Sequence, residues 1–109
     1  MVYHSVEASE ISGYQLDWAV EVARGATVDD NGQLCFVDDQ GSESITDTPR
    51  YEYSTNPKIA RELLIESGIP INIGNVREYE ASGAGLLVAA MRCYVEIKLG
   101  HRVCVPFPE

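Results

Sequence analysis

The segment 51–57, Tyr-Glu-Tyr-Ser-Thr-Asn-Pro, gathers the side chains best suited to holding a ligand. It places two tyrosine rings, two hydroxyls and one amide directly before a predicted helix start. A helix start offers free backbone N–H groups and the positive end of the helix dipole, which together favour an anion. The residues predicted to bind are Tyr53, Ser54, Thr55 and Asn56. The alternative is that the hydroxyls and the amide only cap the helix and the tyrosines pack on the core.

A second helix start has a similar composition. The run 82–85, Ser-Gly-Ala-Gly, precedes a long apolar helix, and its small residues would let a phosphate or carboxylate approach the backbone closely. We therefore add Gly83 and Gly85 to the predicted ligand-binding residues. The run lacks the Lys and the Ser or Thr of a nucleotide triphosphate loop, so a tight strand-to-helix turn is the alternative.

Three further side chains could complete such a site. Trp18, the only tryptophan, follows Asp17 and lies beside the apolar stripe of the first predicted helix. Its ring is either a core-edge residue or a surface that stacks on a base or on a partner side chain. Arg92 projects from an otherwise apolar helix, where a cation needs a carboxylate, a route to solvent or an anionic ligand. Asp17, Trp18 and Arg92 are therefore included in the predicted site.

The sequence contains none of the motifs that mark common enzyme or metal sites. It has no Gly-x-Ser-x-Gly elbow, no phosphate loop ending in Gly-Lys-Ser/Thr and no His-Glu-x-x-His. Its two histidines lie near opposite ends of the chain, and neither has metal-ligand spacing with a cysteine. We therefore predict a protein that is not an enzyme, with no catalytic residue, no bound metal and no cofactor.

The balance of charge constrains the partner. Seventeen acidic residues against eight basic ones give a net charge of −9. Such a protein is repelled at long range by nucleic acid and by anionic membranes, so neither is predicted as a direct partner. The same charge would attract a basic protein surface, such as the groove of a nucleic-acid-binding protein. Solubility alone is the alternative explanation.

Three features predict a cytoplasmic protein. No apolar run reaches the roughly 18–20 residues needed to span a bilayer. The start of the chain lacks the basic stretch and apolar block of a secretory signal. Cys35, Cys93 and Cys104 are odd in number, show no paired spacing and lie among apolar neighbours, which predicts buried, reduced thiols.

The elements that must position these residues follow from apolar periodicity and from helix-end signals. A length of 109 residues and a hydrophobic fraction of 45% predict that residues 1–109 form a single globular domain. Helices are predicted from a capping box at Ser12 to Gly25, from Asn56 to Gly68, and over 86–99.

Short strands are predicted between these helices. Their ranges are 3–6, 34–37, 69–73, 76–81 and 103–105, and the polar stretch 41–49 is predicted to be an exposed, mobile loop. The predicted class is α+β, with about three helices packed on a small, mostly antiparallel sheet. The exposed edges of so small a sheet would allow a homodimer.

Segments of three predicted elements carry motifs of one known family. The motifs are Leu-Asp-Trp-Ala-Val at 16–20 with Gly25, Tyr-Ser-Thr at 53–55, and Leu-Leu-Val-Ala-Ala-Met-Arg-Cys-Tyr-Val at 86–95 with Gly100 and Val-Cys-Val-Pro at 103–106. Together they resemble the NinX-like family of phage accessory proteins over about half of the chain. The family is a domain of unknown function found in phages and prophages. The resemblance therefore implies a phage or prophage origin and a bacterial host cytoplasm, and it implies no reaction.

This chain departs from the family pattern in two places. After Tyr-Ser-Thr it has Asn56-Pro57-Lys58 where the family carries a Trp-Ala-Gln-Gly-Gly-Pro-like stretch. Before the last helix it has Gly-Ala-Gly at 83–85 where the family favours Gly-Pro-Thr-Pro. A ligand specificity carried by these loops would differ here.

Two functions from different classes fit these observations. The first is a non-enzymatic binder of a small anionic, nucleotide-like ligand, which in a phage setting would sequester a signal of host immunity. The second is an acidic protein that binds a host defence protein and covers its nucleic-acid-binding surface, as an anti-CRISPR protein or DNA mimic would. From the sequence we place the small-ligand binder first and keep the inhibitor of a host protein as the alternative.

Overall fold

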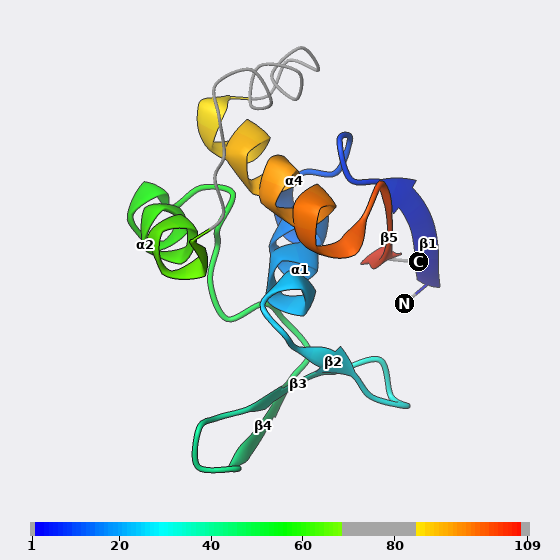
Figure 1. The fold of residues 1–109 in the computed structure, drawn as a ribbon. Helices are drawn as coiled ribbons and strands as arrows, with labels where there is room; N and C mark the ends of the chain where they lie inside the picture. Colours follow the sequence, from blue (N-terminus) through cyan, green and yellow to red (C-terminus); the bar gives the residue numbers. More distant parts are fainter. Residues whose placement is uncertain (1, 69–84, 108–109) are drawn as a thin grey trace.

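The computed structural model describes residues 2–68 and 85–107 (Figure 1). Within these ranges the chain forms three α-helices and two small antiparallel sheets, which confirms the predicted α+β class. Gly83 and the predicted strands over 69–73 and 76–81 lie outside the described residues. The elements are β1 (Val2–Glu7), α1 (Gly13–Ala23), β2 (Thr27–Val28), β3 (Leu34–Val37), β4 (Glu43–Thr46), α2 (Pro57–Ser67), α4 (Leu86–Leu99) and β5 (Arg102–Phe107).

The first sheet joins the two ends of the chain. β1 pairs antiparallel with β5, with Val6 opposite Val103 and His4 opposite Val105. Val103 and Val105 are buried under α1 and α4, whereas Cys104 is exposed, because successive strand residues point to opposite faces. Both strands confirm their predictions, but the prediction of a buried thiol is wrong for Cys104.

α1 forms as predicted but begins differently. Its apolar stripe is buried, and the helix packs against α4 and β5. The predicted capping box is wrong, because the side chain of Ser12 makes no capping hydrogen bond. Gln15 instead donates from Nε2 to the carbonyl oxygen of Pro106 at 3.3 Å. The glutamine serves a tertiary contact because β5 runs beside the first turns of this helix.

α2 and α4 begin and end at the predicted residues. Asn56 caps α2 with its Oδ1, which accepts the N–H of Ile59 at 3.3 Å, and Pro57 is the first helical residue. Gly68 ends the helix with a φ of 66°, a conformation that glycine adopts without strain. α4 packs against α1, α2 and β5, which makes it the central helix of the core, as predicted. Its buried apolar residues include Ala89, Met91, Tyr94 and Val95.

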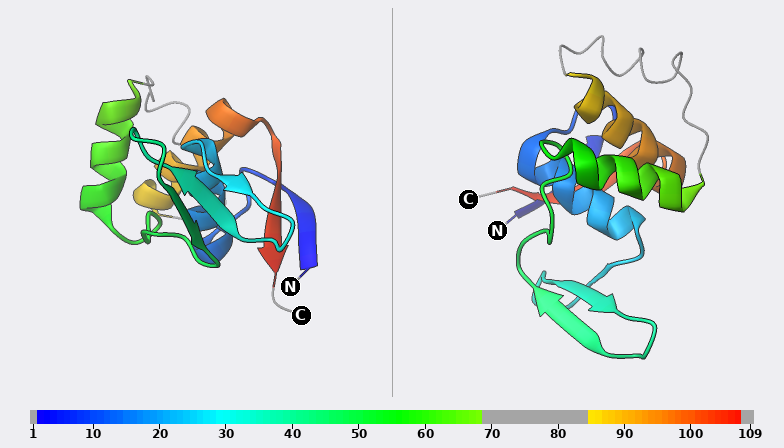
Figure 2. Two further views of the ribbon diagram at one scale, coloured as in Figure 1. Left: turned by 90° about the horizontal axis from the view of Figure 1, so that it is seen from below. Right: turned by 90° about the vertical axis from the view of Figure 1, so that its left-hand side faces the viewer.

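The second sheet stands away from the helices as an arm, residues 27–47 (Figures 1 and 2). Its order is β2-β3-β4, and all neighbours are antiparallel. Asp29 closes the first turn, because its Oδ1 accepts the N–H groups of Asn31 and Gln33, both at 2.9 Å. Asp38 closes the next turn in the same way. The acidic residues of these turns therefore build the arm as well as charging it.

The two faces of the arm differ in their surroundings. Leu34 is fully buried and Phe36 packs against the core, so their shared face is turned toward the body. Val37 and Ile45 lie on the opposite face, where they are 64% and 57% exposed. The register sets Val37 opposite Glu43, one step from Ile45 on the same face. The outward face thus carries two neighbouring apolar side chains.

β4 overturns the prediction of a mobile loop over 41–49. Residues Glu43–Thr46 pair with β3 in register. The sequence Glu-Ser-Ile-Thr holds one large apolar residue, and that residue faces solvent, so the apolar alternation that marks a half-buried strand is absent. β4 forms because it pairs with β3, and the composition of residues 43–46 alone does not predict a strand. β2 likewise lies where no strand is predicted.

Candidate functional site

A surface pocket of about 470 Å³ lies where α1 begins and where the chain returns from the arm to α2. We call it the root pocket. α1 contributes Gly13, Tyr14 and Asp17. The return segment contributes the remaining lining residues, Thr48, Pro49, Tyr51, Glu52, Ser54 and Thr55. The pocket therefore joins two stretches that are about 35 residues apart in the chain and that meet only through the fold.

Asp17 ties the two walls of the root pocket together. Its side chain is only 6% exposed, and its Oδ1 accepts the backbone N–H of Ser54 at 2.7 Å. Burial raises the pKa of this carboxyl above its ordinary value, and the bonds with Ser54 oppose that rise. Nearby Glu52 and Glu21 raise the pKa further, because like charges disfavour ionisation. Asp17 is thus a buried acid, and the described lining of its pocket holds no cation.

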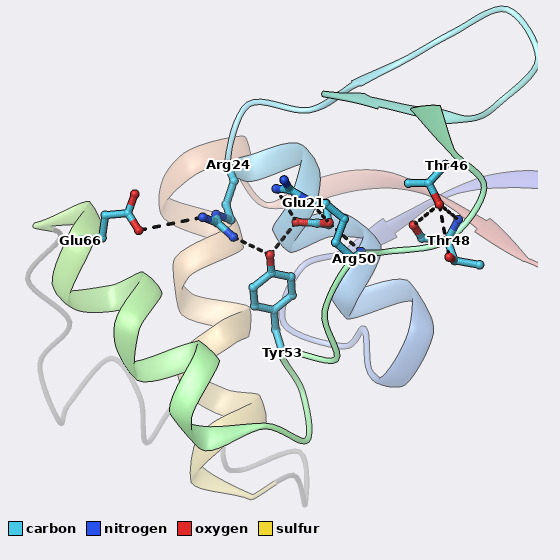
Figure 3. Close-up of polar contacts among 7 residues, drawn as sticks. All are labelled: Glu21, Arg24, Thr46, Thr48, Arg50, Tyr53 and Glu66. Atoms are coloured by element: carbon cyan, nitrogen blue, oxygen red, sulfur yellow. Dashed lines mark hydrogen bonds and ion pairs between the residues drawn. The ribbon is translucent and has the colours of Figure 1, made fainter. Parts of the chain in front are cut away.

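Behind the root pocket, Glu21 holds a buried network (Figure 3). Its carboxylate has no solvent exposure and accepts the Tyr53 hydroxyl at 2.6 Å. Arg50 donates to the same carboxylate from its backbone N–H at 2.8 Å and from Nε at 3.1 Å. Arg24 donates to the Tyr53 hydroxyl at 2.7 Å. The network fastens the return segment to α1, which fixes the position of the arm's C-terminal end.

The same network sets the ionisation of Tyr53. Burial raises the pKa of the Tyr53 hydroxyl, and its hydrogen bond to the Glu21 carboxylate raises it further. Arg24 opposes this rise, since a cation favours the phenolate. Tyr53 is therefore a neutral donor to Glu21 at ordinary pH.

Three of the predicted residues line the root pocket, and two more lie in the same chain segment. Asp17, Ser54 and Thr55 line it together. Tyr53 comes from the same segment but points into the Glu21 network, and it is fully buried (Figure 3). Asn56 acts as the N-cap of α2. For Tyr53 and Asn56 the structure thus matches the alternative considered from the sequence, in which they pack and cap.

The other predicted residues lie elsewhere. Trp18 is 1% exposed in the core, with its ring packed near those of Tyr3 and Tyr14, so the surface-stacking role is wrong for this structure. Arg92 is buried and donates from Nε to the Ile11 carbonyl at 2.5 Å. Burial lowers the pKa of its guanidinium, and Arg92 is not part of the root pocket. Gly85 is exposed at the start of α4 and is also absent from the pocket lining.

Sequence reasoning missed Glu21, Arg24 and Arg50. A signal for the first two exists, because Asp17, Glu21 and Arg24 follow one another at helical spacing and form a polar stripe beside the apolar one. No comparable signal marks Arg50, which lies in an irregular segment. Its guanidinium is fixed by the fold, over the Phe36 ring at 3.8 Å from the centroid.

The chemistry of the root pocket is that of a hydrogen-bond acceptor with aromatic walls. Two carboxylates, Asp17 and Glu52, line it, and no Lys, Arg or His is among its described lining residues. Two tyrosine rings, Tyr14 and Tyr51, complete the walls. Such a surface disfavours an anion and suits a cation, which carboxylates attract and aromatic faces can stack against.

A second charged surface is the arm itself. Between residues 27 and 49 there is no lysine or arginine. The same stretch carries six carboxylates, Asp29, Asp30, Asp38, Asp39, Glu43 and Asp47. The arm stands away from the helices (Figure 2). Five of its six carboxylates are exposed, and Asp29 is half-buried.

No family model, curated protein or solved structure matches this chain. Within residues 2–68 and 85–107, no three His, Cys, Asp or Glu side chains form a group that could hold a metal ion. None of the helices in the described part of the chain is long and apolar enough to cross a membrane.

Proposed function

We propose that this protein is a non-enzymatic binding protein whose arm docks on a basic surface of another protein. The observation that carries the proposal is the arm's composition and placement: six carboxylates, no lysine or arginine, and projection away from the helical body. Opposite charge on a partner would speed association and select against acidic surfaces. In the phage setting that the NinX-like resemblance implies, the partner would be a nucleic-acid-binding defence protein of the host.

The outward face of the arm supports a specific contact in addition to charge attraction. Val37 and Ile45 are neighbours on this face and are largely exposed, with Glu43 beside them. A protein interface needs an apolar centre that loses its water as well as a polar rim. The arm offers both in one small sheet, whose position is fixed by the Glu21 network at its root.

The root pocket favours this function over the binding of a small anionic ligand. A phosphate there would meet Asp17 and Glu52, and no described lining residue would supply a cation. The two groups expected to hold a nucleotide, the Trp18 ring and the Arg92 guanidinium, are buried elsewhere. A nucleotide-like ligand would therefore have to bind without the charge and stacking partners that motivated it.

The test is capture from bacterial lysate by three versions of the protein. The arm variant Asp39→Asn/Glu43→Gln removes two exposed charges that close no turn. The matched control Glu7→Gln/Glu62→Gln removes two exposed charges from β1 and α2. We expect wild type and control to recover the same basic protein, and the arm variant to recover about five- to tenfold less, since each exposed ion pair contributes about 0.5–0.7 kcal/mol.

Two results would count against the proposal. Equal recovery of a partner by all three versions would remove the arm from the interface. A native mass spectrum of the purified protein with a non-covalent adduct of nucleotide mass would instead support the small-ligand function.

A further inference from the structure

We propose that the root pocket binds a guanidinium group, and that an arginine side chain of the partner inserts there when the arm docks. The inference rests on the proposed function, because the arm is what brings a basic surface to this place. The pocket borders the arm directly: Thr48 and Pro49 follow it in the chain, and Tyr14 donates its hydroxyl to the carbonyl oxygen of Asp47 at 3.0 Å.

The charge of the pocket selects a cation. Asp17 is 6% exposed and is hydrogen-bonded by the backbone N–H and the side chain of Ser54, which are both neutral donors. Glu52 adds a second carboxylate at the wall, and the described lining holds no positive side chain. A carboxylate that has lost most of its water is poorly stabilised when ionised. A bound cation would offset this cost, so the site gains more from a cation than a fully hydrated acid would.

The aromatic walls favour guanidinium over ammonium. A guanidinium is planar, stacks on aromatic faces and can bridge carboxylates with its fork of N–H donors, whereas an ammonium is a compact, strongly hydrated charge. Both rings are held before any ligand arrives. Tyr14 is fixed by its bond to the arm, and Tyr51 packs edge-on against Tyr53 at 5.8 Å between centroids. Rings that are already ordered cost less to use in binding.

The chain itself already uses this combination a short distance away. Arg50 lies over the Phe36 ring at 3.8 Å and pairs with the buried Glu21 carboxylate at 3.1 Å. Its guanidinium is also 5.9 Å from the centroid of the Tyr51 ring, which lines the root pocket. Arg50 is paired with Glu21 and is not among the lining residues of the root pocket. The root pocket repeats the pattern of buried carboxylate and aromatic ring with the guanidinium still to be supplied.

The test uses the full-length protein and three blocked amino acids as probes: N-acetyl-arginine methylamide, its lysine counterpart, and the citrulline counterpart, which has the shape of arginine without its charge. Backbone amide NMR spectra would be recorded during titration. We expect saturable, millimolar binding of the arginine probe with shifts centred on Tyr14, Asp17 and Ser54. The lysine probe should bind at least about threefold more weakly, and the citrulline probe should give no saturable shift.

Two exposed lining residues allow variants that keep the fold. Glu52→Gln and Tyr51→Ala should each weaken the arginine probe about three- to tenfold, whereas the control Glu62→Gln should leave its affinity unchanged. The amide spectrum of each variant verifies folding independently of binding. Shifts that are equal for arginine and citrulline, or an arginine affinity that Glu52→Gln leaves unchanged, would overturn the assignment.

Competition separates the two sources of a guanidinium. If a partner arginine inserts, the arginine probe should reduce capture of the partner and the citrulline probe should not. Binding of the arginine probe without such competition would overturn insertion from the partner and would leave a free guanidinium compound as the occupant. The arm variant Asp39→Asn/Glu43→Gln should recover about five- to tenfold less of the partner yet bind the arginine probe as wild type does. Failure of the pocket and failure of the arm are therefore distinguishable.

Discussion

Replacing Tyr53 with phenylalanine removes one hydroxyl from the buried network behind the root pocket and leaves the ring in place. The hydroxyl donates to the fully buried Glu21 carboxylate at 2.6 Å and accepts from Arg24 at 2.7 Å. A hydrogen bond to a charged group contributes about 1.5–3 kcal/mol, and Arg24 can turn to water, so its lost bond adds less. We expect Tyr53→Phe to lower the free energy of unfolding by about 2–3 kcal/mol.

Urea denaturation measures this loss directly. The matched control is Tyr51→Phe, because Tyr51 is 44% exposed and its hydroxyl makes no hydrogen bond within the described part of the chain. Its substitution should change stability by less than about 0.5 kcal/mol. In a thermal scan the Tyr53→Phe variant should lose roughly 8–15 °C in Tm. A change of less than about 1 kcal/mol would refute the reasoning that the Glu21 carboxylate depends on this donor.

The pH dependence of stability gives a second readout of the same hydroxyl. The pKa of Tyr53 is raised in the folded protein, so the native state holds this proton more tightly than the unfolded state does. Its contribution is therefore fully present below pH about 10, the ordinary tyrosine value, and is lost as the pH rises further. Tyr3, Tyr14 and Tyr94 shift in the same direction. Tyr53→Phe should make the alkaline loss of stability shallower without abolishing it.

Three further substitutions test the root pocket and the arm. Asp17→Asn keeps an oxygen for the Ser54 N–H and removes a buried charge whose pKa is raised in the folded protein. Ionisation of such a group costs stability as the pH rises from its unfolded pKa through its folded pKa. At pH 7 the variant should therefore be at least as stable as wild type in urea, and it should bind the arginine probe more weakly. A clear loss of stability would contradict this. Gly32→Ala and Gly41→Ala both place a side chain at positive φ, 76° and 84°, but only at Gly32 does the new Cβ meet the Tyr3 hydroxyl, at 2.8 Å. Urea denaturation should show a loss of about 1–2 kcal/mol for Gly41→Ala and about 1 kcal/mol more for Gly32→Ala; equal losses would show that the Tyr3 contact is dispensable.

The helices were predictable because their ends and their buried faces are written in local sequence. Asn56-Pro57 and Gly68 are signals that act within a few residues, and a continuous apolar run suffices to predict α4. β3 was predictable for the same reason, since Leu34 to Val37 is a short apolar run between two turns.

The arm shows where local sequence carries too little information. β4 exists because it pairs with β3, and its side chains are mostly solvated, so neither apolar alternation nor burial marks it in the sequence. The polar stretch 41–49 predicted a loop, whereas Glu43–Thr46 pairs with β3, and Asp38 closes the turn between the two strands. The charge of the segment was predictable; its shape was not.

The candidate site was predictable in part. Ser54 and Thr55 were found because they precede a helix, and they do line the root pocket. The position of Trp18 beside an apolar stripe does not reveal which neighbour covers its ring, and here core packing covers it. The position of Arg92 on an apolar helix does not reveal its partner, and here the Ile11 carbonyl accepts a hydrogen bond from its Nε. The pairing of Asp17 with Ser54 and of Glu21 with Tyr53 spans 37 and 32 residues, which no local pattern specifies.

The measurement that bears most directly on the arm's role is the salt dependence of binding to the captured partner. Dissociation constants would be measured by interferometry from about 0.05 to about 0.5 M salt, where the Debye length falls from well over 10 Å to a few ångströms. Docking through the arm predicts that the dissociation constant rises steeply with salt for wild type and for Glu7→Gln/Glu62→Gln, and less steeply for Asp39→Asn/Glu43→Gln. A dissociation constant that does not change with salt, or that changes equally for all three proteins, would contradict docking through the acidic arm.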